Sequence, residues 1–350
     1  MEPNQTKCEL AAQVVSHPAY KFATFYTFIV SLLAVPGLLY FMRTRLQPLP
    51  FHGNLKSLLV VFFSATLIYD LYLCFAFGYQ FFVPMFATSS CDLIIDPVLF
   101  KYEQIVILIF IPMPIIITVG FTIERFVAIG MAHKYEKTRT ALGPVLALIL
   151  IAIDITSSFY IYWDETFSDN FVSFVLIPST SAQKLNTYFV MLLFLDIFNL
   201  FCNCTLLFTH KYLKNRYLRQ KSSLSLRYVM EEIFQSSKFT LIVSFVNLLF
   251  FCVYLVSTLI VRTVGQSFFN GYVNYTVARS IYTAIPTNNL LIVFIGYKSL
   301  RHLNTRRHTK IQKTVRIKST GTEGAKNYDD AISKHWDHVY TKYTKMKPAV

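Results

Sequence analysis

A glutamate, an arginine and an aromatic residue stand side by side at the end of a long apolar run. Glu124, Arg125 and Phe126 lie in the stretch TIERFVAIGMAHKYEK, residues 122–137. A buried carboxylate and guanidinium form strong, directional hydrogen bonds, so such a pair can hold helices in one arrangement and release them in another. The alternative interpretation is a helix end that leaves lipid and meets water, where charged side chains are also expected.

A second group of polar side chains lies halfway along apolar stretches, where ionisable groups are costly and therefore functional candidates. Asp70, Asp154 and Asp196 each occupy such a position. Other polar side chains recur at helical spacing, so that three sets each share one helix face: Asp196 with Asn199 and Asn203, Asn247 with Tyr254 and Thr258, and Tyr282 with Pro286 and Asn289. Three such faces predict a solvated cavity between helices. The alternative is a set of interhelical hydrogen bonds that only hold the bundle together.

The predicted cavity would bind a small molecule. Its candidate contacts are Asp70, Glu103, Asp196, Asn199, Asn247, Tyr254 and Tyr282. Acids outnumber bases at mid-depth, which favours a cationic or a neutral polar ligand, although protonated aspartates would themselves be neutral.

The composition indicates that these residues are positioned by a membrane protein. Of the 350 residues, 54% are hydrophobic and 15% are charged, whereas soluble domains carry about a quarter charged residues. A transmembrane helix needs about 20 apolar residues, and seven stretches are long enough: 22–42, 55–79, 102–129, 141–163, 187–208, 239–261 and 275–295. Each must be helical because backbone amides have no other partner in lipid. The expected fold is an all-α bundle of seven transmembrane helices, kinked at Pro36, Pro112, Pro114 and Pro286.

Basic residues set the expected orientation. Of the 33 lysines and arginines, 27 fall in the three alternate loops and the tail that share one side. The positive-inside rule therefore predicts an outer N-terminus, and the net charge of +14 reflects topology rather than a nucleic-acid site. The glycosylation sequons at Asn4 and Asn274 both fall on the predicted outer side.

The expected domains follow from these spans. After the seventh span, residues 297–308 read as an amphipathic helix that lies on the inner leaflet and is held by anionic lipid. The full division is an outer N-terminal segment 1–21, a seven-helix domain 22–296, the amphipathic helix 297–308, and a basic, largely disordered tail 309–350.

Two of the six cysteines are expected on the outer side, where disulfides persist. They are Cys8 and Cys91, and the outer loop 164–186 contains no cysteine. We therefore predict a Cys8–Cys91 disulfide, with two free thiols as the alternative. We find no sequence motif for a metal site, a cofactor or an enzyme.

Seven spans, an outer N-terminus and Glu-Arg-Phe closing the third span resemble a G-protein-coupled receptor. Rhodopsin-like receptors match only in part, because Pro286-Thr-Asn-Asn stands in place of their Asn-Pro-x-x-Tyr. The chain is more similar to nematode serpentine chemoreceptors of the Sra superfamily, in the alpha and alpha-beta classes. The motifs that carry this resemblance are Phe51-His-Gly-Asn-Leu-Lys56, Cys91-Asp-Leu, Glu124-Arg125, Tyr135-Glu136 and Leu226-Arg-Tyr-Val-Met-Glu-Glu232.

The resemblance implies a chemoreceptor in the plasma membrane of sensory neurons, with their cilia as the expected location. Such a receptor binds small environmental chemicals and signals through a heterotrimeric G protein. Helical spacing over residues 224–239 extends the sixth helix below the membrane and brings Glu231 and Glu232 within reach of Arg125. We expect an ion pair there to hold the third and sixth helices together in the inactive state, so that Glu232→Ala raises ligand-free signalling. Arg125 could instead pair with Glu124 or with the G protein.

Two other functions also fit seven helices. An ion-coupled transporter would use the mid-membrane aspartates as ion sites, but the hydropathy pattern contains no inverted repeat. A ligand-gated channel of the insect odorant type places its N-terminus inside, so a glycan on Asn4 would exclude it.

Overall fold

The computed structural model describes residues 3–49, 51–131, 135, 140–167, 171–178, 180–219 and 224–319, with 321–322, 324–330, 332–333 and 336 beyond them. The chain forms two units, Met1–Tyr297 and Lys298–Val350. Within the described residues, every regular element is a helix and no strand occurs.

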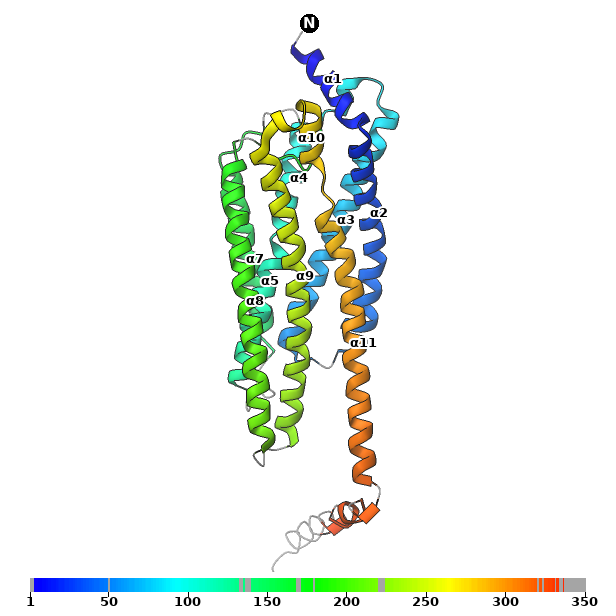
Figure 1. Ribbon diagram of the computed structural model, residues 1–350, viewed down its shortest axis with the longest axis vertical. Coiled ribbons are helices and arrows are strands. Elements are labelled where there is room, and N and C mark those ends of the chain that lie inside the picture. The colour runs from blue at the N-terminus through cyan, green and yellow to red at the C-terminus, as the bar shows by residue number, and fades with distance from the viewer. Residues whose placement is uncertain are drawn as a thin grey trace, which may run out of the picture. The chain divides into compact units, whose positions relative to one another are not determined.

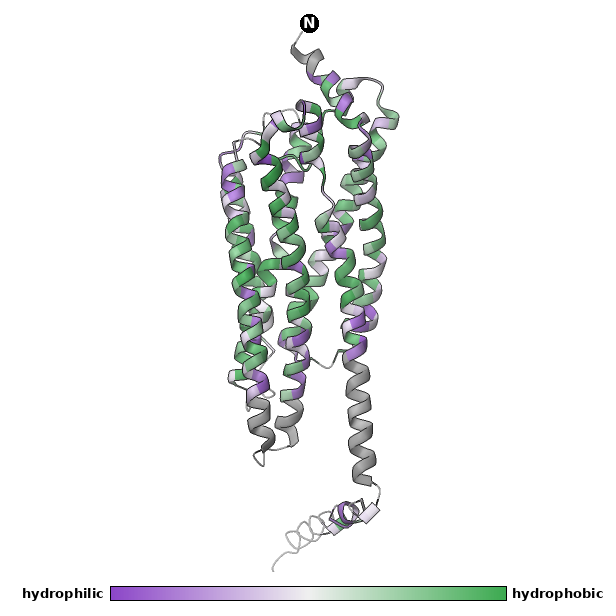
Figure 2. Ribbon diagram, viewed as in Figure 1, coloured by the Kyte–Doolittle hydropathy of each residue, from purple (hydrophilic) through white to green (hydrophobic). Residues whose placement is uncertain are grey.

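Long apolar helices lie side by side in the first unit (Figure 1). Among the residues that the structure describes, six apolar segments are long enough to cross a membrane: Pro18–Leu46, Gly53–Phe86, Ser90–Gly130, Leu142–Tyr162, Ala182–Tyr212 and Met230–Phe268. The helices that build them are α2 (Pro18–Phe41) with the π-helix η1 (Met42–Leu46), α3 (Gly53–Phe86), α4 (Pro97–Phe110), α5 (Met113–Gly130), α7 (Leu142–Tyr162), α8 (Ala182–Arg219) and α9 (Leu224–Phe268). Their apolar residues form a band along the bundle (Figure 2). The seven-helix fold predicted from the sequence is confirmed, with the seventh span in two pieces.

The third span changes direction at Pro112, between α4 and α5. Proline has no N–H, so the carbonyl of Leu108 loses its helical donor. The hydroxyl of Ser158 on α7 donates to that carbonyl at 3.2 Å. Because the next helix satisfies the freed group, the break costs little at membrane depth.

The seventh span is interrupted at residues 281–283. It consists of α10 (Tyr272–Ser280) and the first part of α11 (Ala284–Ser319). The interruption leaves the carbonyl of Tyr282 outside any helix, and Thr27 on α2 donates to it at 2.7 Å. Pro286 lies in the first turn of α11, where its missing N–H breaks no helical hydrogen bond. It therefore helps to start a helix rather than to kink one.

Helix α5 is the centre of the bundle, since it contacts α3, α7, α8 and α9. Close approach of α7 to α3 depends on Gly143, where a Cβ atom would lie 2.1 Å from the carbonyl oxygen of Asn54. The Gly143 N–H donates to the side-chain oxygen of Asn54 at 3.2 Å. This contact holds the start of α3 against the start of α7. We call this end of the bundle, where α5 carries Arg125, the Arg125 end.

The opposite end, which we call the N-terminal end, carries a helix that hydropathy does not indicate. Helix α1 (Pro3–Ser16) packs against the short 3-10 helix η2 (Ser90–Leu93) and α10. A disulfide joins Cys8 of α1 to Cys91 of η2, as the sequence predicts. Val14 and Val15 of α1 are buried against Tyr20 and Val277. The N-terminal segment is thus attached both covalently and by apolar packing.

In the second unit, α11 continues through the predicted amphipathic segment 297–308 as far as Ser319. Helical residues recur within 321–336. Residues 337–350 of the predicted disordered tail lie outside the described residues.

Candidate functional site: a buried ion pair and an aromatic cavity

Arg125 and Glu124 form an ion pair inside the bundle. The Arg125 Nε atom donates to Glu124 Oε2 at 2.5 Å, and the side chains are 1% and 0% exposed. Tyr135, from the chain that follows α5, donates its hydroxyl to the other Glu124 oxygen. Arg125 Nη2 lies 3.4 Å from the same hydroxyl. Two buried charges therefore neutralise each other and gain a neutral partner, which reduces the cost of removing them from water.

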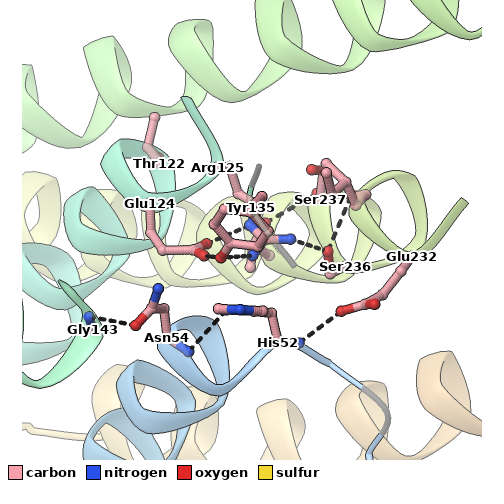
Figure 3. Close-up of polar contacts among 12 residues, drawn as sticks. His52, Asn54, Thr122, Glu124, Arg125, Tyr135, Gly143, Glu232, Ser236 and Ser237 are labelled. Carbon is pink, nitrogen blue, oxygen red and sulfur yellow. Dashed lines mark hydrogen bonds and ion pairs between the residues drawn. The ribbon is translucent and has the colours of Figure 1, made fainter. Parts of the chain in front are cut away.

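Arg125 also connects two helices. Its Nη1 atom donates to the hydroxyl of Ser236 on α9. Figure 3 shows Arg125 lying between the Glu124 carboxylate and this serine. We call Glu124, Arg125, Tyr135 and Ser236 the Arg125 cluster. Because Arg125 belongs to α5, the cluster ties the third span to the sixth.

Arg125 pairs with Glu124, an alternative that the sequence left open, and its partner on α9 is Ser236 rather than the expected Glu231 or Glu232. Glu232 lies one helical turn before Ser236, and its Oε1 atom accepts from the backbone N–H of His52 at 2.6 Å. Glu231 accepts from Gln235 on its own helix at 3.3 Å. Ser236, one helical turn after Glu232, is the α9 residue that bonds Arg125.

His52 brings the loop before α3 into the same site. Its ring centroid lies 4.1 Å from that of Tyr135, and its Nδ1 atom accepts from the backbone N–H of Asn54 at 3.4 Å. Burial is the main cause that lowers the pKa of His52 below its ordinary value, which favours the neutral ring that this acceptor role requires. His52 and Tyr135 both belong to motifs noted in the sequence, but the motifs assigned them no role. Phe126 is 48% exposed and lies outside the cluster.

The mid-membrane polar residues hydrogen-bond between helices. Asp70 on α3 accepts from Asn289 on α11 at 2.8 Å, and Asn247 on α9 accepts from Asn288 at 2.9 Å. On α8, Asn199 and Asn203 bond to threonines of α5: Asn199 to Thr118 at 3.2 Å, and Asn203 to Thr122 at 2.6 Å. These contacts join the helices in the layer above the Arg125 cluster.

Two predicted ligand contacts lie elsewhere. Glu103 on α4 accepts from the hydroxyl of Tyr72 on α3. Asp196 is fully buried, and neither of its carboxylate oxygens has a hydrogen-bond partner among the described residues. Neither residue lines the aromatic cavity described next.

A cavity lies among α3, α4, α7, α8 and α9 near the N-terminal end. It is lined by two predicted contacts, Tyr254 and Tyr282, together with Gln104, Tyr162, Phe77, Ile107, Leu108, Ile111, Phe174, Val175, Ile177, Leu185 and Phe189. Its volume is about 20 Å³, which is room for about one water molecule. A neighbouring space of similar volume is lined by residues that include Asn247, Asn288 and Asn289. The two spaces are lined by residues of the polar faces predicted on the sixth and seventh spans, whereas Asp196, Asn199 and Asn203 of α8 are not among their lining residues.

The loop between α7 and α8 closes the cavity. We call its described residues, 164–167, 171–178 and 180–181, the lid. Gln104 donates to the carbonyls of Phe174 and Leu176, and the Phe171 ring stacks on Phe100 with centroids 3.8 Å apart. The carbonyl of Phe171 also accepts from Ile95 N–H at 2.9 Å. Packing and hydrogen bonds therefore hold this cysteine-free loop over the cavity.

Comparison with known proteins finds serpentine receptors over most of the chain. The profile described as serpentine type 7TM GPCR chemoreceptor Srb matches residues 16–251. Serpentine receptor class beta-12 of Caenorhabditis elegans is 54% identical over 342 residues, which cover 97% of this chain and 98% of the relative. Class beta-5 of the same organism is 52% identical over 97% of this chain, and class beta-15 is 34% identical over 95% of it. Both matches cover 98% of the relative.

These matches correct the finer part of the predicted resemblance. The short motifs indicated the alpha and alpha-beta classes of the Sra superfamily, whereas alignments over nearly the whole chain indicate class beta. The predicted kind of protein, a multi-pass chemosensory receptor of the G-protein-coupled type, is unchanged, and neither a channel nor a transporter is favoured. The chain belongs to the Srb, or class beta, family of serpentine seven-transmembrane chemoreceptors.

Proposed function

We propose that this receptor binds a small environmental chemical in the cavity beneath the lid and activates a heterotrimeric G protein at the Arg125 end. The observation that carries the proposal is the Arg125 cluster, in which a buried ion pair on α5 is bonded to α9. A contact of this kind has two discrete states, made or broken, and can therefore bias a helix arrangement.

The structure supports a route between the two sites. Tyr254 of the cavity lies on α9, the helix that carries Ser236. Tyr282 lies in the interruption of the seventh span, and its hydroxyl is 2.6 Å from that of Tyr69 on α3. A ligand that moves either tyrosine would act on α9 or on the break before α11. Ligand binding would then favour the state in which Arg125 leaves Ser236.

Removing the Ser236 hydroxyl tests this contact. We expect Ser236→Ala to raise ligand-free G-protein activation about threefold to tenfold, because the net contribution of a typical hydrogen bond, about 0.5–1.5 kcal/mol, would no longer favour the inactive arrangement. Ser237→Ala is the matched control, since the buried Ser237 hydroxyl has no hydrogen-bond partner among the described residues. Nucleotide exchange per receptor at the cell surface is the measurement. Equal activation by both variants would show that the Arg125–Ser236 contact does not restrain the receptor.

We further propose that the N-terminal end faces outside and that the plasma membrane, with anionic lipid against residues 297–308, is the site of action. Asn274 on α10 is exposed, and Asn4 lies on α1. We expect both to carry glycans, so that glycosidase treatment increases gel mobility in the wild type but not in the Asn4→Gln, Asn274→Gln double variant. A wild-type chain without glycan, expressed in cells that glycosylate a control receptor, would contradict this orientation. Immunostaining of sensory cilia tests the finer location.

Screening small molecules for G-protein activation in a heterologous cell tests the proposed function itself. The receptor should activate a G protein when one or more of the molecules is present, and a variant with the cavity filled by Val175→Trp should not respond. A molecule that binds the purified receptor but leaves every tested G protein inactive would contradict the proposal. Ligand-gated current without G-protein activation would instead indicate a channel.

A further inference from the structure

The chemistry of the cavity lining restricts the ligand, given the proposed function in which the cavity is the ligand site. Nine of its thirteen lining residues are aliphatic or phenylalanine, and the others are Gln104, Tyr162, Tyr254 and Tyr282. None of these thirteen described residues is charged. A cation or an anion buried there would be without a counter-ion, which is strongly unfavourable.

Three charged groups on helices near the cavity have partners outside it. Arg262 on α9 donates to the side chain of Asn186 on α8, and Arg279 on α10 donates to the carbonyl of Ile177 at 3.3 Å. Glu103 accepts from Tyr72. These groups already have partners and are not among the lining residues. A ligand charge would therefore meet no complementary charge in the cavity.

Three of the four polar side chains that line the cavity are already hydrogen-bonded. Tyr162 donates to Gln104 Oε1 at 2.9 Å, and Gln104 Nε2 donates to the lid carbonyls of Phe174 and Leu176. The Tyr282 hydroxyl is paired with Tyr69. The Tyr254 hydroxyl has no hydrogen-bond partner among the described residues, although the side chain is buried. It is thus the lining group with capacity left for a ligand.

We infer that the cavity takes a neutral, mainly apolar molecule with a single hydrogen-bonding oxygen, and that the Tyr254 hydroxyl recognises this oxygen. Small ketones, aldehydes and alcohols have this chemistry. Phe77, Phe174 and Phe189 supply faces and edges for an apolar or aromatic body. Of the two ligand classes that the acidic residues suggested, cationic and neutral polar, the lining supports the neutral one.

The lid is the part of the lining that must move. A benzene-sized molecule needs a cavity of about 150 Å³, well above the present volume of about 20 Å³. Phe174, Val175 and Ile177 belong to the lid, whereas the other lining residues lie on helices or at the breaks of the third and seventh spans. Displacing these three side chains enlarges the site without separating the helices.

Three probes of one shape test the inference on the full chain in lipid nanodiscs: acetophenone, the 1-phenylethylammonium cation and ethylbenzene. Binding is measured as the concentration-dependent rise in the thermal unfolding midpoint. We expect acetophenone to bind at least about tenfold more tightly than the cation. Tyr254→Phe should weaken acetophenone binding about threefold to tenfold, the range for one lost hydrogen bond, and leave ethylbenzene binding unchanged. Tyr160→Phe, at a tyrosine that is 73% exposed, is the matched control and should bind all three as the wild type does.

Several results would overturn the inference. Tighter or equal binding of the cation would show that the site contains a charge partner. Equal acetophenone binding by Tyr254→Phe and the wild type would remove the proposed role of Tyr254, and no shift with acetophenone would show that the cavity does not accept a neutral molecule of this size. The assay needs no G protein. If the three probes bind as expected but no molecule leads to G-protein activation, the proposed function is contradicted and the inference about the cavity is not.

Discussion

Glu124→Gln raises ligand-free G-protein activation about tenfold, which corresponds to a shift of about 1.4 kcal/mol between inactive and active arrangements. The substitution keeps the shape of the side chain and removes its charge. Arg125, only 1% exposed, then becomes a buried cation without a counter-ion. Because an uncompensated buried charge is costly, the guanidinium is driven toward water and away from Ser236. Nucleotide exchange per surface receptor measures the change.

Two comparisons make this result specific. Glu9→Gln has the same chemistry on the exposed face of α1 and is expected to leave ligand-free signalling unchanged. Glu232→Ala is expected to have a smaller effect than Glu124→Gln, because Glu232 accepts from the backbone of His52 rather than from Arg125. Wild-type signalling by Glu124→Gln at normal surface level would refute the restraining role of the ion pair.

Loss of the Cys8–Cys91 disulfide is the second large expected effect, on stability rather than signalling. The bond joins residues 83 positions apart, and closing a loop of that length restricts the unfolded chain by about 3–5 kcal/mol. We expect Cys8→Ser to lower the thermal unfolding midpoint of the purified receptor by roughly 5–10 °C. Freed from its covalent attachment, α1 keeps its noncovalent packing, which includes the buried side chains of Val14 and Val15.

The double variant distinguishes the bond from the side chains. Cys8→Ser, Cys91→Ser and their combination should lose the same stability, because each breaks one shared bond. Cys74→Ala, at a free and half-buried cysteine, is the control and should change the midpoint far less. Additive losses in the double variant, or an equal loss in Cys74→Ala, would contradict a stabilising disulfide.

The number and kind of spans could be predicted because hydropathy depends on composition alone. The details that hydropathy averages over could not. The interruption at residues 281–283 sits inside an apolar stretch and depends on Thr27, which is 255 positions away from Tyr282. Helix α1 contains too few apolar residues to stand out, and its position follows from a disulfide and a small buried patch. Neither feature has a local sequence signal.

For the candidate site, the sequence predicted which helix ends lie near each other but not which side chains form hydrogen bonds. Arg125 was recognised by type and place, and helical spacing brought the start of α9 beside it. The partner depends on helix rotation and depth, which select Ser236 over Glu232 by one turn. Asp70 and Asn247 were chosen because buried polar groups at mid-membrane are rare, and both have polar partners from α11. Gln104 was not predicted because it donates to backbone carbonyls of the lid. Every residue has a backbone carbonyl, so the lid sequence gives no sign of this contact.

A double-variant cycle in ligand-free signalling tests most directly whether the Arg125 cluster holds α5 to α9. Glu124→Gln, Ser236→Ala and their combination are compared at equal surface level. If both substitutions act by releasing Arg125, the double variant is no more active than Glu124→Gln alone. The interaction free energy between the two substitutions is then about 0.5 kcal/mol or more. Independent effects that add to within about 0.3 kcal/mol would show that Glu124 and Ser236 do not act through one contact, and would contradict the account.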